Sequence, residues 1–380
     1  MKALVVISRY ITHFNVKTYK HLFDSMVQPE NISAAIDKAA EHKHKRRDVK
    51  EVLKHKGKYV KIVQDMLLND EFKPPEYKLH KIKEGSKKKT RYIEKPYFKY
   101  DQIVQHVLIT QLKPIIMKSL HPQAYGSLED RGMLQIAKRI SKWLKNDPKG
   151  TRYCLQMDIH HCYPSVDKEI LIQKYHRIIK DERFNKVNDA VIKAFPIGIS
   201  LGAPTSVWHI HFLLTEFDHY ISSLDNVKHY ARFMDDIIIF GSNKRKLHRV
   251  EENAINFLKE KLNLEVNHSH QVFPIEWQDK KGKIHGRPLD VCGYLFYRNK
   301  RILRKTRMLG ITKKARKLKK KKKLTHYDAQ QMLSQMSWLK HSDTYDMYLE
   351  HVEPYVKKRT LRRIISRVTR KKRMAELRVA

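Results

Sequence analysis

Two adjacent acids, Asp235 and Asp236, lie between two short apolar runs whose residues favour β-strands. Adjacent carboxylates repel each other, and the end of a strand gains no packing from them, so a bound divalent cation would explain the pair. A solvated hairpin turn is the alternative for an isolated pair, but these flanks are too apolar for an ordinary surface turn. A third acid, Asp158, ends the mostly apolar segment 153–159 in a similar setting.

If these strands are neighbours, three carboxylates converge at one edge of a sheet. Such a cluster is stable only when divalent cations neutralise it. Two hard cations roughly 4 Å apart suit in-line nucleotidyl transfer, where one activates a 3′-hydroxyl and the other holds a triphosphate. The pattern therefore predicts that Asp158, Asp235 and Asp236 are catalytic and bind metal.

The elements that must position these acids follow from periodicity and from Gly and Pro. Strands are expected at 153–159, 271–275 and 290–297, with a glycine-punctuated loop at 196–204 and helices at 168–180, 205–223 and 244–263. Upstream, two helices are expected within 32–68, a basic hairpin at 77–82 and 90–93 with its turn at 85–89, and helices at 100–117 and 132–144. Downstream, basic helical segments are expected at 298–323 and 357–373, with a further helix at 327–339. This order favours an α+β fold over a doubly wound parallel sheet.

The charge of the chain is extreme: 79 Lys and Arg residues against 40 Asp and Glu residues give a formal net charge of +39 over 380 residues. Such a surplus predicts a polyanionic partner, with nucleic acid favoured over an anionic membrane surface. No apolar run is long enough to span a bilayer, and the apolar start at 3–7 is too short for a signal peptide. The cysteines Cys154, Cys162 and Cys292 fit neither a disulfide framework nor a zinc module, and we expect a cytoplasmic protein.

Three segments together resemble the reverse transcriptases in order and spacing: 156–165, 198–206 and the aromatic-x-Asp-Asp sequence at 233–236. The resemblance covers about residues 30–310, and the basic C-terminal part matches only loosely. It implies a right-hand polymerase fold with fingers, palm and thumb. The expected boundaries are an N-terminal helical extension at 1–75, fingers at 76–151, a palm with interleaved fingers segments at 152–297, a helical basic thumb at 298–350 and a basic tail at 351–380.

The resemblance also implies a metal site. Asp158 and Asp235 would bind two Mg²⁺ ions, for which Mn²⁺ could substitute, and Asp236 would complete the acidic cluster. The backbone of Ile159 would face the metal-bound triphosphate.

Further residues are implied to bind the incoming dNTP. Tyr163 stands at the family's steric-gate position, five residues after Asp158, with His161 and Cys162 before it; packing in the core is the alternative for Tyr163. Arg91 on the basic hairpin matches a fingertip arginine that contacts the triphosphate. Lys83 is a second candidate, with a solvated lysine as its alternative.

Leu201 and Gly202 would line the templating base pair, and Leu201 could instead simply pack. Gly293 and Tyr294 match the primer grip, against the alternative of an ordinary strand with a glycine bulge. The lysine that many family members use as a general acid is missing from 267–270, where His270 could serve.

Within the family, the sequence is most similar to reverse transcriptases of diversity-generating retroelements. An aliphatic residue, Leu201, stands where most members have glutamine, and 271–275 followed by Gly293-Tyr294 is similar to that group. The length leaves no room for a maturase, endonuclease or RNase H domain. Val207 and the insertion 276–288 depart from the pattern, so group II intron-like, retron and defence-type reverse transcriptases are alternatives.

The subtype implies error-prone copying of a template RNA into cDNA, particularly at template adenines, for mutagenic retrohoming. It implies a prokaryotic or phage-encoded protein whose partners are the template RNA, the RNA/cDNA duplex, dNTPs and a small basic helical accessory protein, which can itself be oligomeric. Two other classes compete with a polymerase: a non-catalytic RNA-binding protein on a polymerase fold, and a basic chromatin-like or ribosomal protein.

Overall fold

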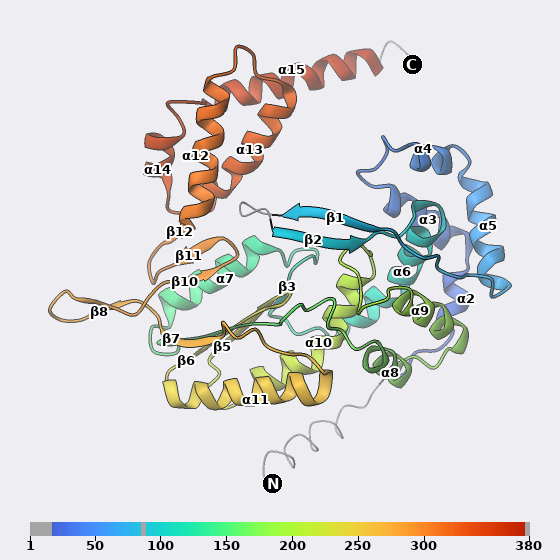
Figure 1. The fold of residues 1–380 in the computed structure, drawn as a ribbon, viewed down its shortest axis with the longest axis horizontal. Helices are drawn as coiled ribbons and strands as arrows, with labels where there is room; N and C mark the ends of the chain where they lie inside the picture. The colour runs from blue at the N-terminus through green and yellow to red at the C-terminus, as the bar shows by residue number, and fades with distance from the viewer. Residues whose placement is uncertain (1–16, 85–88, 377–380) are drawn as a thin grey trace, which may run out of the picture. The chain divides into compact units, whose positions relative to one another are not determined.

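The computed structural model describes residues 17–84 and 89–376 (Figure 1). Residues 85–88 of the expected hairpin turn, the apolar start at 3–7 and residues 377–380 of the tail lie outside the described residues. The chain divides into two compact units. The first comprises Met1–Lys83, Thr90–Glu129 and Leu155–Val272, and the second comprises Glu84–Lys89, Asp130–Cys154 and Phe273–Ala380. No helix in the described ranges has both the length and the apolar character that a bilayer span requires.

A five-stranded sheet carries the acidic hairpin, with strand order β3-β5-β6-β4-β7. Its strands are β3 (Ala124–Tyr125), β4 (Tyr153–Asp158), β5 (His229–Phe233), β6 (Asp236–Gly241) and β7 (Gln271–Pro274). β5 and β6 are antiparallel, and Phe233 pairs with Asp236, so Met234 and Asp235 form the turn. The four apolar residues that follow Asp236 are all buried, as expected for an interior strand. The predicted strands around the acids are confirmed, while β3 is too short to leave a periodic signal.

The first unit also contains helices. They are α2 (Leu22–Met26), α3 (Pro29–Ala40), α4 (Arg47–Lys54), α5 (Lys56–Leu68), the π-helical turn η1 (Phe98–Gln102), α6 (Ile103–Ser119), α8 (Lys168–Ile178), α9 (Glu182–Lys193), α10 (Ser206–Ser222) and α11 (Lys244–Leu262). α10 packs against α6, α8, α11 and β5, which explains why it is buried on nearly every side. α11 packs against β6. The basic hairpin is also confirmed, as paired strands β1 (Leu79–Glu84) and β2 (Lys89–Glu94).

One helix prediction in this unit was wrong, and the helices α2 and α9 were not predicted. The segment 32–68 holds three helices and not two, because the backbone leaves the helical conformation at His55 although the apolar periodicity continues across it. α9 was not predicted at all. Its start is marked by Asp181, whose carboxylate accepts a hydrogen bond from the Phe184 amide at 3.1 Å as an N-cap.

The second unit contains α7 (Met133–Asn146), two small sheets and a series of C-terminal helices. The strands are β8 (Trp277–Gln278), β9 (Ile284–His285), β10 (Leu289–Val291), β11 (Tyr294–Phe296) and β12 (Arg301–Leu303). The helices are α12 (Lys305–Lys319), α13 (His326–Lys340), α14 (Tyr345–His351) and α15 (Lys358–Glu376). The insertion 276–288 contains the β8–β9 hairpin.

The single strand expected at 290–297 is wrong. Cys292 and Gly293 have φ +51° and +79°, so the chain turns back and forms the β10–β11 hairpin. The helix expected from 298 begins only at Lys305, because β12 adds a third strand beside β11.

Candidate active site

The turn that carries Asp235 has a constrained backbone. Met234 has φ +56°, in the left-handed region that is costly for any residue with a side chain. Its amide donates to the Tyr125 carbonyl at 3.0 Å, and its carbonyl accepts from Nη1 of Arg232 at 2.8 Å. A β-carbon on Gly126 would come within 2.6 Å of the Met234 side chain. The two peptide groups that flank Met234 are therefore each held by one hydrogen bond, and the bond from Arg232 holds the one that precedes Asp235.

Asp158 ends the strand beside this turn. β4 and β6 are neighbours in the sheet, and the Ile159 amide donates to the Asp235 carbonyl at 3.4 Å. The end of β4 therefore lies beside the start of β6, which begins at Asp236. The condition for the acids to converge, that their strands are neighbours, is met, and the catalytic roles of the acids stay predictions.

The charge of the acids reaches Cys162, which is buried next to them. Burial raises the pKa of the Cys162 thiol far above its usual range, and Asp235 and Asp158 raise it further, while Arg232 acts in the opposite direction. Cys162 therefore stays a neutral thiol at physiological pH and is unsuited to bind a metal or to attack a phosphate.

In residues 17–84 and 89–376, no group of three or more His, Cys, Asp or Glu side chains is arranged to hold a metal ion. The type of donor nevertheless suits a hard cation, because Asp158, Asp235 and Asp236 offer carboxylate oxygens and Ile159 offers a backbone carbonyl. These residues fit Mg²⁺ by chemistry and by their positions on neighbouring strands, and their side chains do not form a closed set of ligands in this structure.

Tyr163 is buried and is held by the glycine loop. Its carbonyl accepts from the Ile199 amide at 3.0 Å. Gly198 has φ +52°, and a β-carbon there would come within 2.4 Å of the carbonyl oxygens of Tyr163 and Pro164. Only glycine fits this contact, so the loop fixes the backbone of the expected steric gate. Burial raises the pKa of the Tyr163 hydroxyl well above its usual value, and it stays protonated.

The same loop contacts the basic hairpin. The Ser200 hydroxyl donates to the Glu94 carbonyl at 2.7 Å, and a β-carbon on Gly202 would come within 2.2 Å of that oxygen. Between these two contacts, the Leu201 side chain is 44% exposed and does not pack in the core. On the hairpin itself, Arg91 of β2 is half-buried and Lys83 of β1 is exposed.

The remaining expected site residues have mixed surroundings. His161 is exposed, with its ring 4.2 Å from that of His160. Nδ1 of His270 lies 2.9 Å from the Asn267 carbonyl, and Nε2 lies 3.6 Å from Glu251. The backbone amide of the same Asn267 donates to the Asp158 carbonyl at 2.8 Å. The segment with His270 therefore adjoins the end of β4.

Gly293 and Tyr294 lie in the second unit, where the Tyr294 ring is buried. Its centroid is 5.4 Å from that of Trp338, and its hydroxyl donates to the Trp338 carbonyl at 3.4 Å. A β-carbon on Gly293 would come within 2.8 Å of the Arg307 guanidinium. Tyr294 therefore serves the core of this unit, and the primer-grip role stays a prediction.

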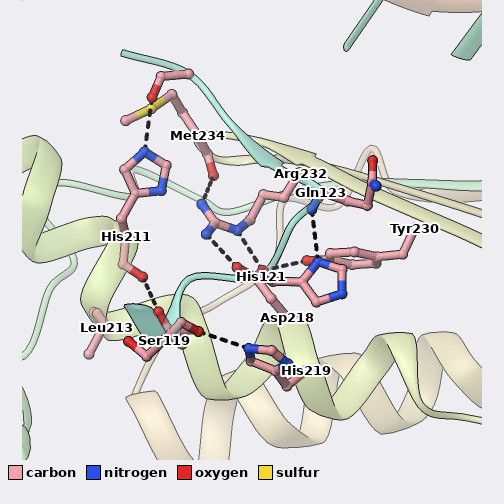
Figure 2. A network of polar contacts seen from close by, with 12 residues as sticks. Ser119, His121, Gln123, His211, Leu213, Asp218, His219, Tyr230, Arg232 and Met234 are labelled. Carbon is pink, nitrogen blue, oxygen red and sulfur yellow. Dashed lines mark hydrogen bonds and ion pairs between the residues drawn. The ribbon is translucent and has the colours of Figure 1, made fainter. Parts of the chain in front are cut away.

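The residues that hold the turn were not among those predicted from the sequence. Figure 2 shows Arg232 of β5 between Asp218 of α10 and the carbonyl of Met234. Nε and Nη2 of Arg232 donate to the two oxygens of Asp218 at 2.7 and 2.6 Å, and both side chains have no exposed surface. Burial lowers the pKa of Arg232, but Asp218 outweighs it and the net pKa is raised. The available signal was an arginine within the short strand β5 and an acid, Asp218, among the buried residues of α10.

A family model described as reverse transcriptase (RNA-dependent DNA polymerase) matches residues 81–285, more than half of the chain. Apo telomerase from Candida tropicalis is similar at 12% identity with a TM-score of 0.49, over 78% of this chain and 59% of that chain. Telomerase from Candida albicans, in complex with the TWJ fragment of telomeric RNA, is similar at 12% identity with a TM-score of 0.45, over 73% of this chain and 55% of that chain. This chain thus spans somewhat over half the length of those telomerase chains, and no curated protein matches it. Because the family model covers the acidic turn, the glycine loop and Asp158 together, the chain belongs to the reverse transcriptase family.

Proposed function

We propose that this protein is an RNA-directed DNA polymerase whose active site lies at the end of β4 and the β5–β6 turn. The observation that carries the proposal is the hydrogen bond from the Ile159 amide to the Asp235 carbonyl, which keeps the strands of Asp158 and Asp236 side by side. The family match over 81–285 supports the reaction. Bound Mg²⁺ ions would supply activation of the primer 3′-hydroxyl and neutralisation of the triphosphate charge.

The residues of this chain divide the remaining work. Asp158, Asp235 and Asp236 hold the metal ions, and the Ile159 backbone faces the triphosphate. Tyr163, whose backbone is fixed by Gly198, blocks a ribose 2′-hydroxyl and favours dNTPs.

The basic hairpin and the residues beside the acids complete the nucleotide site. Arg91 and Lys83 contact the triphosphate, and His161 and Cys162 contribute to its surroundings. Arg91 is the better candidate of the two cations, because a guanidinium binds phosphate through two parallel hydrogen bonds whereas an ammonium acts as a point charge.

The nucleic-acid partners follow from charge. The net charge of +39 and the exposed arginines of α15 suit binding of a template RNA and an RNA/cDNA duplex through their phosphates. Gly293 with the adjacent Arg307 is the part of the expected primer grip that suits contact with a backbone phosphate.

We further propose the diversity-generating subtype, with Leu201 and Gly202 beside the templating base pair and an accessory protein as partner. The exposed Leu201 side chain supports this, because it is free to meet a base pair and offers no polar contact. Sequencing cDNA copied from a defined RNA should show substitutions concentrated at template adenines, and Leu201→Gln should reduce them severalfold. A uniform, low error rate in the unmodified protein would favour the group II intron-like, retron or defence alternatives.

The reaction is tested with a primed RNA template, dNTPs and Mg²⁺. The unmodified protein should extend the primer, and Asp235→Asn should abolish extension while RNA binding is unchanged. A folded, RNA-binding protein without extension would instead support the non-catalytic alternative.

A further inference from the structure

The buried pair of Arg232 and Asp218 is attached to the acidic turn by one specific bond. Two nitrogens of the guanidinium bind the carboxylate, and the third, Nη1, donates to the Met234 carbonyl at 2.8 Å (Figure 2). Tyr230 donates its hydroxyl to the same carboxylate at 2.5 Å. One rigid planar group thus connects α10 to the peptide immediately before Asp235.

The pair is poorly explained as a source of stability. Removing two charges from water is costly, and buried ion pairs can be replaced by apolar residues of similar volume with little loss of stability. A fixed geometry is what the ion pair offers and an apolar pair lacks, because a guanidinium donates in defined directions.

The geometry matters at Met234 because its conformation is strained. A left-handed φ of +56° persists only where the surroundings impose it. Here the bond from Arg232 holds the carbonyl, the bond to Tyr125 holds the amide, and Gly126 leaves space for the side chain. Without Arg232, the peptide could rotate, and the Asp235 carboxylate would move with it.

Charge gives a second reason for the pairing. An arginine beside the acidic turn would weaken binding of a cation there. The Asp218 carboxylate, 2.6 Å from Nη2 of Arg232, opposes this charge, and the Tyr230 hydroxyl donates to the same carboxylate. Asp218 therefore offsets part of the positive charge that Arg232 places beside the acidic turn, while the guanidinium keeps its directional hydrogen bond to the Met234 carbonyl.

We propose that Arg232 and Asp218 are positioning residues, which fix the peptide between Met234 and Asp235 so that the Asp235 carboxylate points to the metal site. This inference rests on the proposed role of Asp235. It predicts that the pair affects the chemical step and the metal requirement, and leaves binding of template RNA unchanged.

The test compares Arg232→Lys with the unmodified protein in single-nucleotide extension over a range of Mg²⁺ concentrations. Lysine keeps the charge opposite Asp218 but cannot donate to the carboxylate and the Met234 carbonyl in the fork geometry. We expect kcat to fall by about 10- to 100-fold, as misplacement of a reacting group by about 1 Å can cause. We also expect the half-saturating Mg²⁺ concentration to rise severalfold, with the KM for dNTP changed less than twofold.

Glu216→Gln is the matched control. Glu216 also lies on α10, but it pairs with Arg177 and with the buried Lys174, at 3.2 Å from the latter, and both partners belong to α8. The substitution should lower Tm while kcat and the Mg²⁺ requirement stay unchanged. If Arg232→Lys lowers Tm to a similar extent but keeps kcat within twofold and the Mg²⁺ curve unshifted, the pair is merely structural and the proposal is wrong.

A second variant keeps the test decisive if Arg232→Lys does not fold. The triple substitution Arg232→Met, Asp218→Leu, Tyr230→Phe replaces the network with apolar groups and removes the bond to Met234. We expect it to fold, with the same loss of kcat and the same shift in Mg²⁺ requirement; full activity would overturn the proposal. Asp235→Asn is run beside both, because retained activity there would overturn the proposed function itself, independently of Arg232.

Discussion

Arg232 in the first unit and Arg363 in the second carry the same charge in opposite surroundings. Arg232 has no exposed surface, and its three guanidinium nitrogens donate to Asp218 and to the Met234 carbonyl. Arg363 is exposed on α15, a helix whose sequence contains no acid before Glu376. The first arrangement specifies a geometry at short range, and the second supplies a field that acts on a polyanion at longer range. The two arginines thus serve different purposes, and each purpose can be disturbed separately.

The largest expected difference is in stability. Asp218→Ala leaves Arg232 buried without its counter-charge, and we expect a loss of about 3–5 kcal/mol in the free energy of unfolding. Arg363→Ala removes an exposed charge and should change that free energy by less than about 0.5 kcal/mol. Denaturant unfolding of both variants measures the difference. Equal losses would mean that burial does not distinguish the two arginines.

The second prediction concerns RNA affinity. Replacing Arg362, Arg363 and Arg367 together with glutamine should weaken binding of single-stranded RNA about tenfold or more near 0.15 M salt, and should reduce the salt-dependence slope by roughly 0.7 for each phosphate that is no longer neutralised. kcat at saturating template should stay unchanged. Replacement of the same three residues with lysine is the control, because it keeps the charge. An unchanged slope in the glutamine variant would exclude α15 from the RNA-binding surface.

These contrasts also show which features the sequence can predict. The strands of Asp158 and Asp235 could be predicted because a short apolar run that ends in an acid leaves a local signal. The pairing of Arg232 with Asp218 could not, because strand and helix periodicity do not show which side chains of α10 and β5 face each other. The prediction of one strand at 290–297 failed because the composition of the segment is that of a single strand. The positive φ angles of Cys292 and Gly293 instead make the chain turn back on itself there.

α9 was missed for a third reason. Its segment does carry apolar residues at helical spacing, Phe184, Val187 and Val191, a signal that the prediction did not use. Its start depends on Asp181, whose carboxylate also accepts from the Phe23 amide at 2.9 Å. A hydrogen bond between residues 158 positions apart in the sequence leaves no periodic trace. The exposure of Leu201 could not be predicted, because composition alone cannot show whether an aliphatic side chain in a loop is exposed or packed.

The smallest predicted effect is on the pH dependence of stability, to which a buried histidine should contribute and an exposed one should not. Burial lowers the pKa of His209 to about 3, and its Nδ1 lies 2.9 Å from the Tyr175 hydroxyl. The unfolded chain takes up a proton near pH 6.5 while the folded protein does not, so stability should fall as the pH drops from about 6.5 towards 3. The loss from this group should be on the order of 1–2 kcal/mol at about pH 5.

Denaturant unfolding between about pH 7 and 5 measures how the free energy of unfolding changes with pH. His209→Gln should flatten the curve, whereas substitution of the exposed His268 by glutamine should leave it unchanged. A His209→Gln curve as steep as that of the unmodified protein would show that other groups cause the pH dependence.

The most direct test of the account is a double-mutant cycle on single-turnover dNTP incorporation, with Asp158→Asn, Asp235→Asn and their combination on a primed RNA template with Mg²⁺. Because both carboxylates are proposed to act on one reaction step, each single substitution should reduce incorporation to background and the double variant should be no slower, as for residues that act as a unit. RNA binding and Tm of the three variants should match those of the unmodified protein. Incorporation at the unmodified rate by either folded single variant would contradict an active site at the end of β4 and the β5–β6 turn.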